Sequence, residues 1–274
     1  MGQAPLPEAA LPEAYFRTPS PARFWNYLQG GRDNYPLDRV AADAFATAFP
    51  DIFMLADQAR RFLMRAVRAV AAEGGVRQFL DVGCGLPVPR DLADIHEVAQ
   101  RVRPDARVVY VDNDKVVRAH TQAWLRSSTP EGACSYVEAD AREPERILAE
   151  AGRTLDLSEP VAVVLSGILG HITDFDEARS VLDHLMNRIV PGSYLVLHDG
   201  VDKDRAVRQG IDNRNATGIQ PYHLRTEEQF RAYFRGLEVL EPGIGLAARW
   251  RPEKVEVGVL RPVITCWGAV ARKT

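Results

Sequence analysis

Strand-like and helix-like hydrophobic patterns alternate along residues 78–198 of the chain. The strand-like runs, such as Arg107-Val-Val-Tyr-Val-Asp112 and Pro160-Val-Ala-Val-Val-Leu-Ser166, are continuous and β-branched, which is typical of buried parallel strands. Amphipathic segments with a helical period separate them. This alternation predicts a doubly wound, Rossmann-like α/β sheet with ligands at the carboxyl ends of its strands. Seven strands are expected, and they end near residues 81, 112, 138, 166, 198, 240 and 270.

The N-terminal part has a different pattern. Residues 1–19 contain four prolines and no hydrophobic period, which predicts a disordered arm. Three helices are expected next, at 22–29, 37–49 and 51–73, and together they form a helical cap over residues 20–75. Residues 76–274 then make the sheet domain, and we find no internal repeat or second catalytic domain.

A glycine turn follows the first strand and gives the first indication of a ligand. Asp81 ends the strand, and Gly83 and Gly85 allow the backbone to turn sharply and approach a bound molecule closely. The second strand ends on another carboxylate, Asp112. Ribose hydroxyls are hydrogen-bond donors that need acceptors. A carboxylate at the end of the second strand, beside the glycine turn at the end of the first, therefore favours a nucleoside ligand.

Two polar segments are candidates for lids over this turn. Residues 29–39 connect two helices and are either an ordinary turn or a lid that supplies hydrogen bonds and an aromatic face. Residues 201–224 follow the fifth strand and are either a substrate lid or a long surface loop. The lid or substrate residues expected from these segments and the preceding helix are Tyr27, Asn34, Tyr35, Tyr222 and His223.

His171, just after the fourth strand, is the best-placed candidate for a catalytic general base, since a neutral imidazole has a suitable pKa. The alternative is a histidine that only bonds a neighbouring loop. His198, beside Asp199 at the end of the fifth strand, is the second candidate. No cluster with metal-ligand spacing accompanies these residues, so no metal is expected.

Composition and charge exclude several classes of protein. The chain has 274 residues, 34 Lys and Arg against 37 Asp and Glu, and a formal charge of −3, so no general attraction to nucleic acid or anionic lipid is expected. No apolar run approaches the roughly 20 residues of a membrane span, and the N-terminus lacks a secretory pattern. We therefore expect a cytoplasmic protein with no membrane or nucleic-acid partner. Three separated cysteines argue against a disulfide framework.

The motif series resembles a known family. Asp81-x-Gly83-x-Gly85, Asp112 after a hydrophobic strand and Ala139-Asp140 are similar to the motifs of class I S-adenosylmethionine-dependent methyltransferases. Phrases such as Tyr27-Leu-Gln-Gly-Gly-Arg-Asp-Asn-Tyr35 resemble the actinobacterial S-adenosyl methyltransferase family, formerly a domain of unknown function. This resemblance covers nearly the whole chain after the arm and implies an antiparallel last strand.

The resemblance also implies the cofactor, S-adenosylmethionine, whose product is S-adenosylhomocysteine, and the residues that bind it. Gly83 and Gly85 would approach its methionine part above Asp81, Asp112 would accept from the ribose hydroxyls, and Asp140 would accept from the adenine amine. Asn113 would lie against the adenine. The full implied cofactor set is Asp81, Gly83, Gly85, Asp112, Asn113, Asp140, Ala141 and Ser166.

Alternatives remain at this point. A nicotinamide-dependent dehydrogenase also uses a glycine turn and a strand-end acid, but its fingerprint has three glycines that open directly into a helix, whereas Leu86-Pro87 follows here. Within the methyltransferase interpretation, the chain is either an enzyme that acts on a small-molecule acceptor or a cofactor-binding sensor without turnover. The sequence does not name the acceptor.

Overall fold

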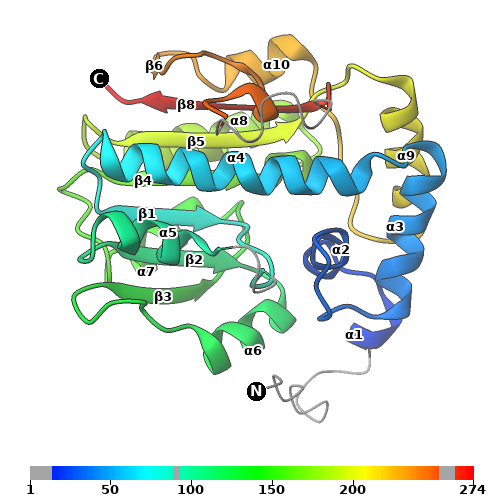
Figure 1. Ribbon diagram of the computed structural model, residues 1–274, viewed down its shortest axis with the longest axis horizontal. Helices are drawn as coiled ribbons and strands as arrows, with labels where there is room; N and C mark the ends of the chain where they lie inside the picture. Colours follow the sequence, from blue (N-terminus) through cyan, green and yellow to red (C-terminus); the bar gives the residue numbers. More distant parts are fainter. Residues whose placement is uncertain (1–13, 89–92, 253–262) are drawn as a thin grey trace.

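The computed structural model describes residues 14–88, 93–252 and 263–274, and its centre is one twisted sheet (Figure 1). Seven strands follow one another in the order β3-β2-β1-β4-β5-β8-β6. The first five pair in parallel, and β8 pairs antiparallel with β5, which confirms the expected fold class. An additional two-residue strand, β7, pairs with β8. The strands are β1 Gln78–Val82, β2 Arg107–Asp112, β3 Ala133–Glu138, β4 Ala162–Ser166, β5 Tyr194–Gly200, β6 Glu238–Val239, β7 Gly245–Leu246 and β8 Cys266–Arg272.

Two hydrophobic cores cover the two faces of the sheet. Phe79 and Val108 face the long helix α4 (Ile52–Ala72) and α5 (Ile95–Val102), whereas Leu80 and Val109 face the opposite layer. Successive strand residues point to opposite faces, so a strand buried on both sides must be apolar throughout, as the sequence pattern indicated. The opposite layer contains α7 Pro144–Ala151, α8 Phe175–Asn187 and α10 Glu227–Ala232.

A cap of helices lies at the carboxyl edge of the sheet (Figure 1). It contains α2 (Pro21–Leu28) and α3 (Pro36–Ala48), and α4 leads from it across the sheet. Of the expected arm, residues 1–13 lie outside the described residues. Residues 14–17 form a short helix, α1 (Ala14–Arg17), next to α2. The remaining helix, α6 (Lys115–Trp124), follows β2.

The polar segment 201–224 contains a helix, α9 (Arg205–Asn215), that the sequence did not indicate. Asp204 caps this helix by accepting a hydrogen bond from the backbone of Ala206 at 2.7 Å. Phe45 of α3 packs so closely against Gly210 that a Cβ there would lie 2.7 Å from the ring. The segment therefore belongs to the cap and is not a long surface loop. No helix among the described residues is long and apolar enough to cross a membrane.

Candidate functional site

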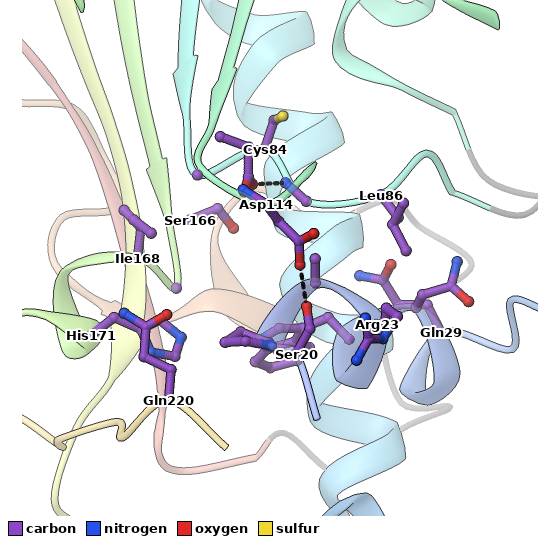
Figure 2. Close-up of a pocket in the computed structure, with 18 of the residues that line it drawn as sticks. Ser20, Arg23, Gln29, Cys84, Leu86, Asp114, Ser166, Ile168, His171 and Gln220 are labelled. Atoms are coloured by element: carbon purple, nitrogen blue, oxygen red, sulfur yellow. Dashed lines mark hydrogen bonds between the residues drawn. The ribbon is translucent and has the colours of Figure 1, made fainter. Parts of the chain in front are cut away.

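A cavity of about 500 Å³ opens at the carboxyl ends of β1, β2, β4 and β5, beneath α2 (Figure 2). β1 lies between β2 and β4 in the sheet. The chain adds β2 and β3 on one side of β1, and then returns to add β4 and β5 on the other side. This switch point is where doubly wound sheets bind ligands. The volume of the cavity lies within the range of about 300–1,000 Å³ that is usual for small-molecule sites.

The glycine turn after β1 forms the floor of the cavity. Gly83 and Gly85 have φ values of 78° and 66°, the left-handed region that favours glycine. The backbone N–H groups of Gly83 and Cys84 donate to the carbonyl of Val111 at 2.8 and 3.0 Å, which ties the turn to β2. A Cβ at Gly83 would lie 2.6 Å from Ile168, whereas a Cβ at Gly85 would meet nothing within 4 Å. Packing therefore requires a glycine at 83, and the backbone at 85 is open to a ligand.

We expect Gly83→Ala to lower the free energy of unfolding by about 2–3 kcal/mol, because it combines left-handed strain with a clash against Ile168. Denaturant unfolding measures this loss. Gly218→Ala is the matched control, since Gly218 has a φ of 82° but open space around its Cβ position, and it should lose only about 1 kcal/mol. Equal losses in the two variants would contradict the packing argument.

Asp112 holds the turn from the end of β2. One carboxylate oxygen accepts from the backbone of Gly85 at 2.8 Å and the other from the backbone of Asp114 at 3.0 Å. Burial raises its pKa to about 6, and these backbone donors oppose the rise. A carboxylate has roughly four lone-pair sites, so Asp112 retains acceptor capacity toward the cavity that it lines.

Asp140, Ala141 and Asn113 lie in a small side cavity that adjoins the main one and shares Gly83 and Asp112 with it. The guanidinium of Arg142 donates to both carboxylate oxygens of Asp140, at 2.9 and 2.8 Å, and lowers its pKa to about 2. The amide of Asn113 donates to the same carboxylate at 3.1 Å. Asp140 is therefore an ionised acceptor beside Asp112, and Arg142 is a member of the site that the motif series did not identify.

Asp81 and Arg60 are a buried acid and a buried base that both line the cavity. Asp81 is 4% exposed, and burial raises its pKa to about 7, although the charge of Arg60 opposes the rise. Arg60 of α4 donates to the carbonyl of Ala93 and to Asp94 at 3.1 Å, but its buried Nε has no hydrogen-bond partner. An unpaired buried N–H is costly, and a ligand that carries both an acid and an amine would satisfy these two side chains.

The roof of the cavity is tied to the sheet through Ser20. Ser20 is the N-cap residue of α2, but its hydroxyl makes no capping bond and donates instead to the carboxylate of Asp114 (Figure 2). Its backbone N–H donates to Asp38 at 2.9 Å, and Asp38 also binds Arg23 at 2.7 Å. The cap is thus connected to the loop that holds Asp112.

We expect Ser20→Ala to reduce affinity for a ligand in the cavity by about threefold to tenfold. A hydrogen bond to a charged group is worth about 1.5–3 kcal/mol, and a ligand that does not itself make this bond feels only part of its loss. Titration calorimetry measures the affinity. Ser158→Ala is the control, since Ser158 makes a similar bond to Asp156 on the surface at 2.6 Å. An unchanged affinity in Ser20→Ala would show that the roof contact does not contribute to binding.

Two histidines line the cavity. His171 lies beside Gln220 (Figure 2), and its Nδ1 donates to the carbonyl of Pro221 at 2.9 Å, so its Nε2 is left without a proton in the neutral ring. Burial, together with the charge of Arg214, lowers its pKa to about 3. His198 lies at the end of β5 next to Ser166 of β4, which also lines the cavity.

The residues expected in the first lid do not line this cavity. Tyr27 packs edge-on against Phe53 with ring centres 5.9 Å apart, and the buried amide of Asn34 donates to Asn26 at 3.0 Å. Tyr35 caps α3 and packs against Phe16. The side of α2 that faces the cavity instead presents Ser20, Arg23, Trp25, Asn26 and Gln29.

Tyr222 and His223 also have other partners. The Tyr222 hydroxyl donates to the buried carboxylate of Asp199, and Tyr222 lines a separate interior cavity. The His223 ring lies 3.3 Å from the hydroxyl of Thr173. Their placement therefore does not support a direct role in the main cavity. Among the described residues, no group of three His, Cys, Asp or Glu side chains could hold a metal ion.

The fold and the strand-end carboxylates define a Rossmann-like protein with a cofactor cavity at the switch point of its sheet, as in class I S-adenosylmethionine-dependent methyltransferases. The model of the S-adenosyl methyltransferase family matches residues 10–274, and the chain belongs to that family. A DUF574 family protein from Streptomyces avermitilis is 38% identical, with a TM-score of 0.89, over 94% of this chain and 99% of that one. A protein from Thermobifida fusca proposed to be a methyltransferase is 34% identical, with a TM-score of 0.84, over 96% and 98%. No curated protein matches the chain.

The site fits the cofactor of this family, S-adenosylmethionine. The orphaned Nε of Arg60 and the buried acid of Asp81 suit the carboxylate and the amine of its methionine part. The open backbone at Gly85 leaves space beside them, Asp112 retains acceptor capacity of the kind that ribose hydroxyls need, and the carboxylate of Asp140 lies in the adjoining cavity. Family membership excludes the dehydrogenase alternative.

Proposed function

We propose that this methyltransferase acts on a small-molecule acceptor that is enclosed between the sheet and the helical cap. The observation that carries the proposal is the roof contact, in which Ser20, the residue before α2, donates to Asp114 within the cavity that Asp112 lines. A site roofed in this way suits a molecule that enters whole. A polymer or a folded protein would need an open groove beside the transferred methyl group.

The chain's own residues would hold the cofactor through four side chains, Arg60 on α4 and three carboxylates along the sheet edge. Asp81 and Arg60 bind the two charges of the methionine part, Asp112 binds the ribose, and Asp140 binds the adenine amine. S-adenosylmethionine supplies an activated methyl group when it is bound. The protein therefore contributes mainly by holding the acceptor in line with that group and by excluding water.

A proton must leave the acceptor if its nucleophile is a hydroxyl. His171 is the candidate that the sequence predicts, and its free Nε2 can accept a proton. Its low pKa of about 3 restricts it to accepting a proton as the new bond forms, when the acceptor becomes strongly acidic. His198 is the other imidazole of the cavity.

The test is methyl transfer from S-adenosylmethionine with a labelled methyl group. The enzyme is incubated separately with a low-mass cell extract, with RNA and DNA, and with the protein fraction, and we expect label only in low-mass products. Label in a macromolecular fraction alone would contradict the proposal. Binding of S-adenosylhomocysteine without label in any fraction would favour the sensor alternative.

A further inference from the structure

A second, interior cavity lies beneath the cap and has a mainly apolar lining. It holds about 40 Å³, and it shares Trp25 and His198 with the main cavity, so these two side chains stand where the cavities meet. Phe24 and Phe45 supply aromatic surface to its walls. This space has room for only one edge of a flat molecule, and the rest of such a molecule would have to lie in the main cavity.

His198 is the polar group at this junction. It is 5% exposed at the carboxyl end of β5, and its register partner on β4 is Ser166, at the edge of the cofactor site. Its Nε2 lies 3.1 Å from the sulfur of Cys266, whereas its Nδ1 is buried and has no hydrogen-bond partner. The hydroxyl of Thr265, which also lines the interior cavity, is fully buried and unpartnered as well.

Two unpartnered polar groups in one apolar cavity are costly in the ligand-free protein. A buried polar group left unpaired costs about 1–3 kcal/mol, and such groups are uncommon in native structures. A ligand hydroxyl can donate to one group and accept from the other. The pair therefore indicates a hydroxyl-bearing ligand with an apolar body.

Arg214 of α9 adds a charge to the same cavity. It is 2% exposed, lies 5.0 Å from the centre of the Phe24 ring, and donates to the side chain of Asn215 at 2.8 Å and to the carbonyl of Gln220 at 2.9 Å. Within the described part of the chain, no carboxylate forms an ion pair with it. A buried guanidinium without a counter-charge is complementary to an acidic group on a ligand.

We infer that the interior cavity is the acceptor subsite, that the acceptor is a hydroxylated aromatic acid, and that His198 binds its nucleophilic hydroxyl while Arg214 attracts its acidic group. The inference rests on the proposed function and makes His198, rather than His171, the proton acceptor. Trp25 and Phe24 provide the surface on which the aromatic ring lies.

The proton and electron balance is simple. The acceptor oxygen forms a bond to the methyl carbon, the bond from that carbon to the cofactor sulfur breaks and leaves its electron pair on sulfur, and the hydroxyl proton goes to Nδ1 of His198. Burial lowers the pKa of His198 to about 4, so the ring is neutral and Nδ1 can accept. Its Nε2–H then faces the sulfur of Cys266.

The test measures binding as well as activity. Protein saturated with S-adenosylhomocysteine is titrated by calorimetry with 2-, 3- and 4-hydroxybenzoate, with benzoate, which lacks the hydroxyl, and with phenol, which lacks the acid. We expect at least one hydroxybenzoate to bind at least tenfold more tightly than both benzoate and phenol. If none of the three hydroxybenzoates binds while S-adenosylhomocysteine does, this inference alone is overturned. If S-adenosylhomocysteine does not bind, the proposed cofactor site on which the inference rests is overturned.

Variants assign the roles. Arg214→Gln should abolish the preference for the hydroxybenzoate over phenol and leave S-adenosylhomocysteine affinity within threefold of the original.

His198→Gln should lower methyl transfer to that hydroxybenzoate at least 100-fold, whereas His171→Gln should lower it less than tenfold. His184→Gln is the control, since His184 pairs with Glu145 on the far layer. Circular dichroism checks that each variant folds, and a larger loss in His171→Gln than in His198→Gln would overturn the assignment to His198.

Discussion

Asp112→Ala should weaken the binding of S-adenosylmethionine and S-adenosylhomocysteine by roughly 100- to 1,000-fold. Each hydrogen bond to a charged group is worth about 1.5–3 kcal/mol, and the ribose offers two hydroxyls to this carboxylate. The substitution also releases the backbone of Gly85, which Asp112 holds at 2.8 Å, so part of the loss comes from a less ordered turn. Titration calorimetry measures the change directly.

Asp105→Ala is the matched control for Asp112→Ala. Asp105 precedes the opposite end of β2, is largely exposed and pairs with Arg77 at 3.3 Å, so its loss should leave affinity unchanged. Unfolding curves separate a binding defect from a folding defect. Less than a fivefold loss of affinity in a folded Asp112→Ala protein would show that the ribose is bound elsewhere.

Asp81→Asn should stabilise the ligand-free protein and weaken its binding of the cofactor. The folded-state pKa of Asp81 is raised to about 7 from an ordinary value of 3.8, so between pH 4 and pH 7 the folded protein binds more protons than the unfolded chain. Stability therefore falls as the pH rises through this range, and ionised Asp81 opposes folding above it. We expect the variant to gain roughly 2–4 kcal/mol at pH 8 and nothing near pH 4.

The affinity of Asp81→Asn for the cofactor should fall, whereas its stability rises. An ionised Asp81 can pair with the amine of the methionine part, and the neutral amide cannot, so we expect about tenfold weaker binding at pH 8. Denaturant unfolding at pH 4 and pH 8 and calorimetry at pH 8 measure the two effects. A variant that is less stable than the original protein at pH 8 would contradict the burial cost assigned to Asp81.

The strand-end chemistry could be predicted because it is local in sequence. A β-branched run that stops at Asp112, and a turn that needs Gly83 and Gly85, leave direct marks in the chain, and the structure brings these residues together around one cavity. The parallel, doubly wound sheet follows from the alternation of strands and helices.

The contacts that the sequence did not reveal are those between distant segments. α9 contains few apolar residues, and its helical face becomes evident only when Val207 and Ile211 are seen packed in the core with Phe45. The bond from Ser20 to Asp114 joins residues 94 positions apart. The pairing of Ser20 with the loop after β2 depends on packing between segments that are distant in the chain, which no local pattern records.

The lid residues illustrate a second limit. Aromatic and amide side chains near a site suggest contact with a ligand, but Tyr222 uses its hydroxyl to bind Asp199, and Gly170 and Gly200 leave space for its ring. Residue type alone did not show that the hydroxyl of Tyr222 already has a buried partner within the protein. Burial and hydrogen-bond partners in the structure show this.

The measurement that tests the account most directly is a calorimetric titration of the protein with S-adenosylhomocysteine, with NAD as the control ligand. The account predicts one binding site of micromolar or better affinity for S-adenosylhomocysteine and no comparable binding of NAD. Tight binding of NAD, with no response to S-adenosylhomocysteine, would contradict the assignment of the cavity at the ends of β1, β2 and β4 as the methyl-donor site.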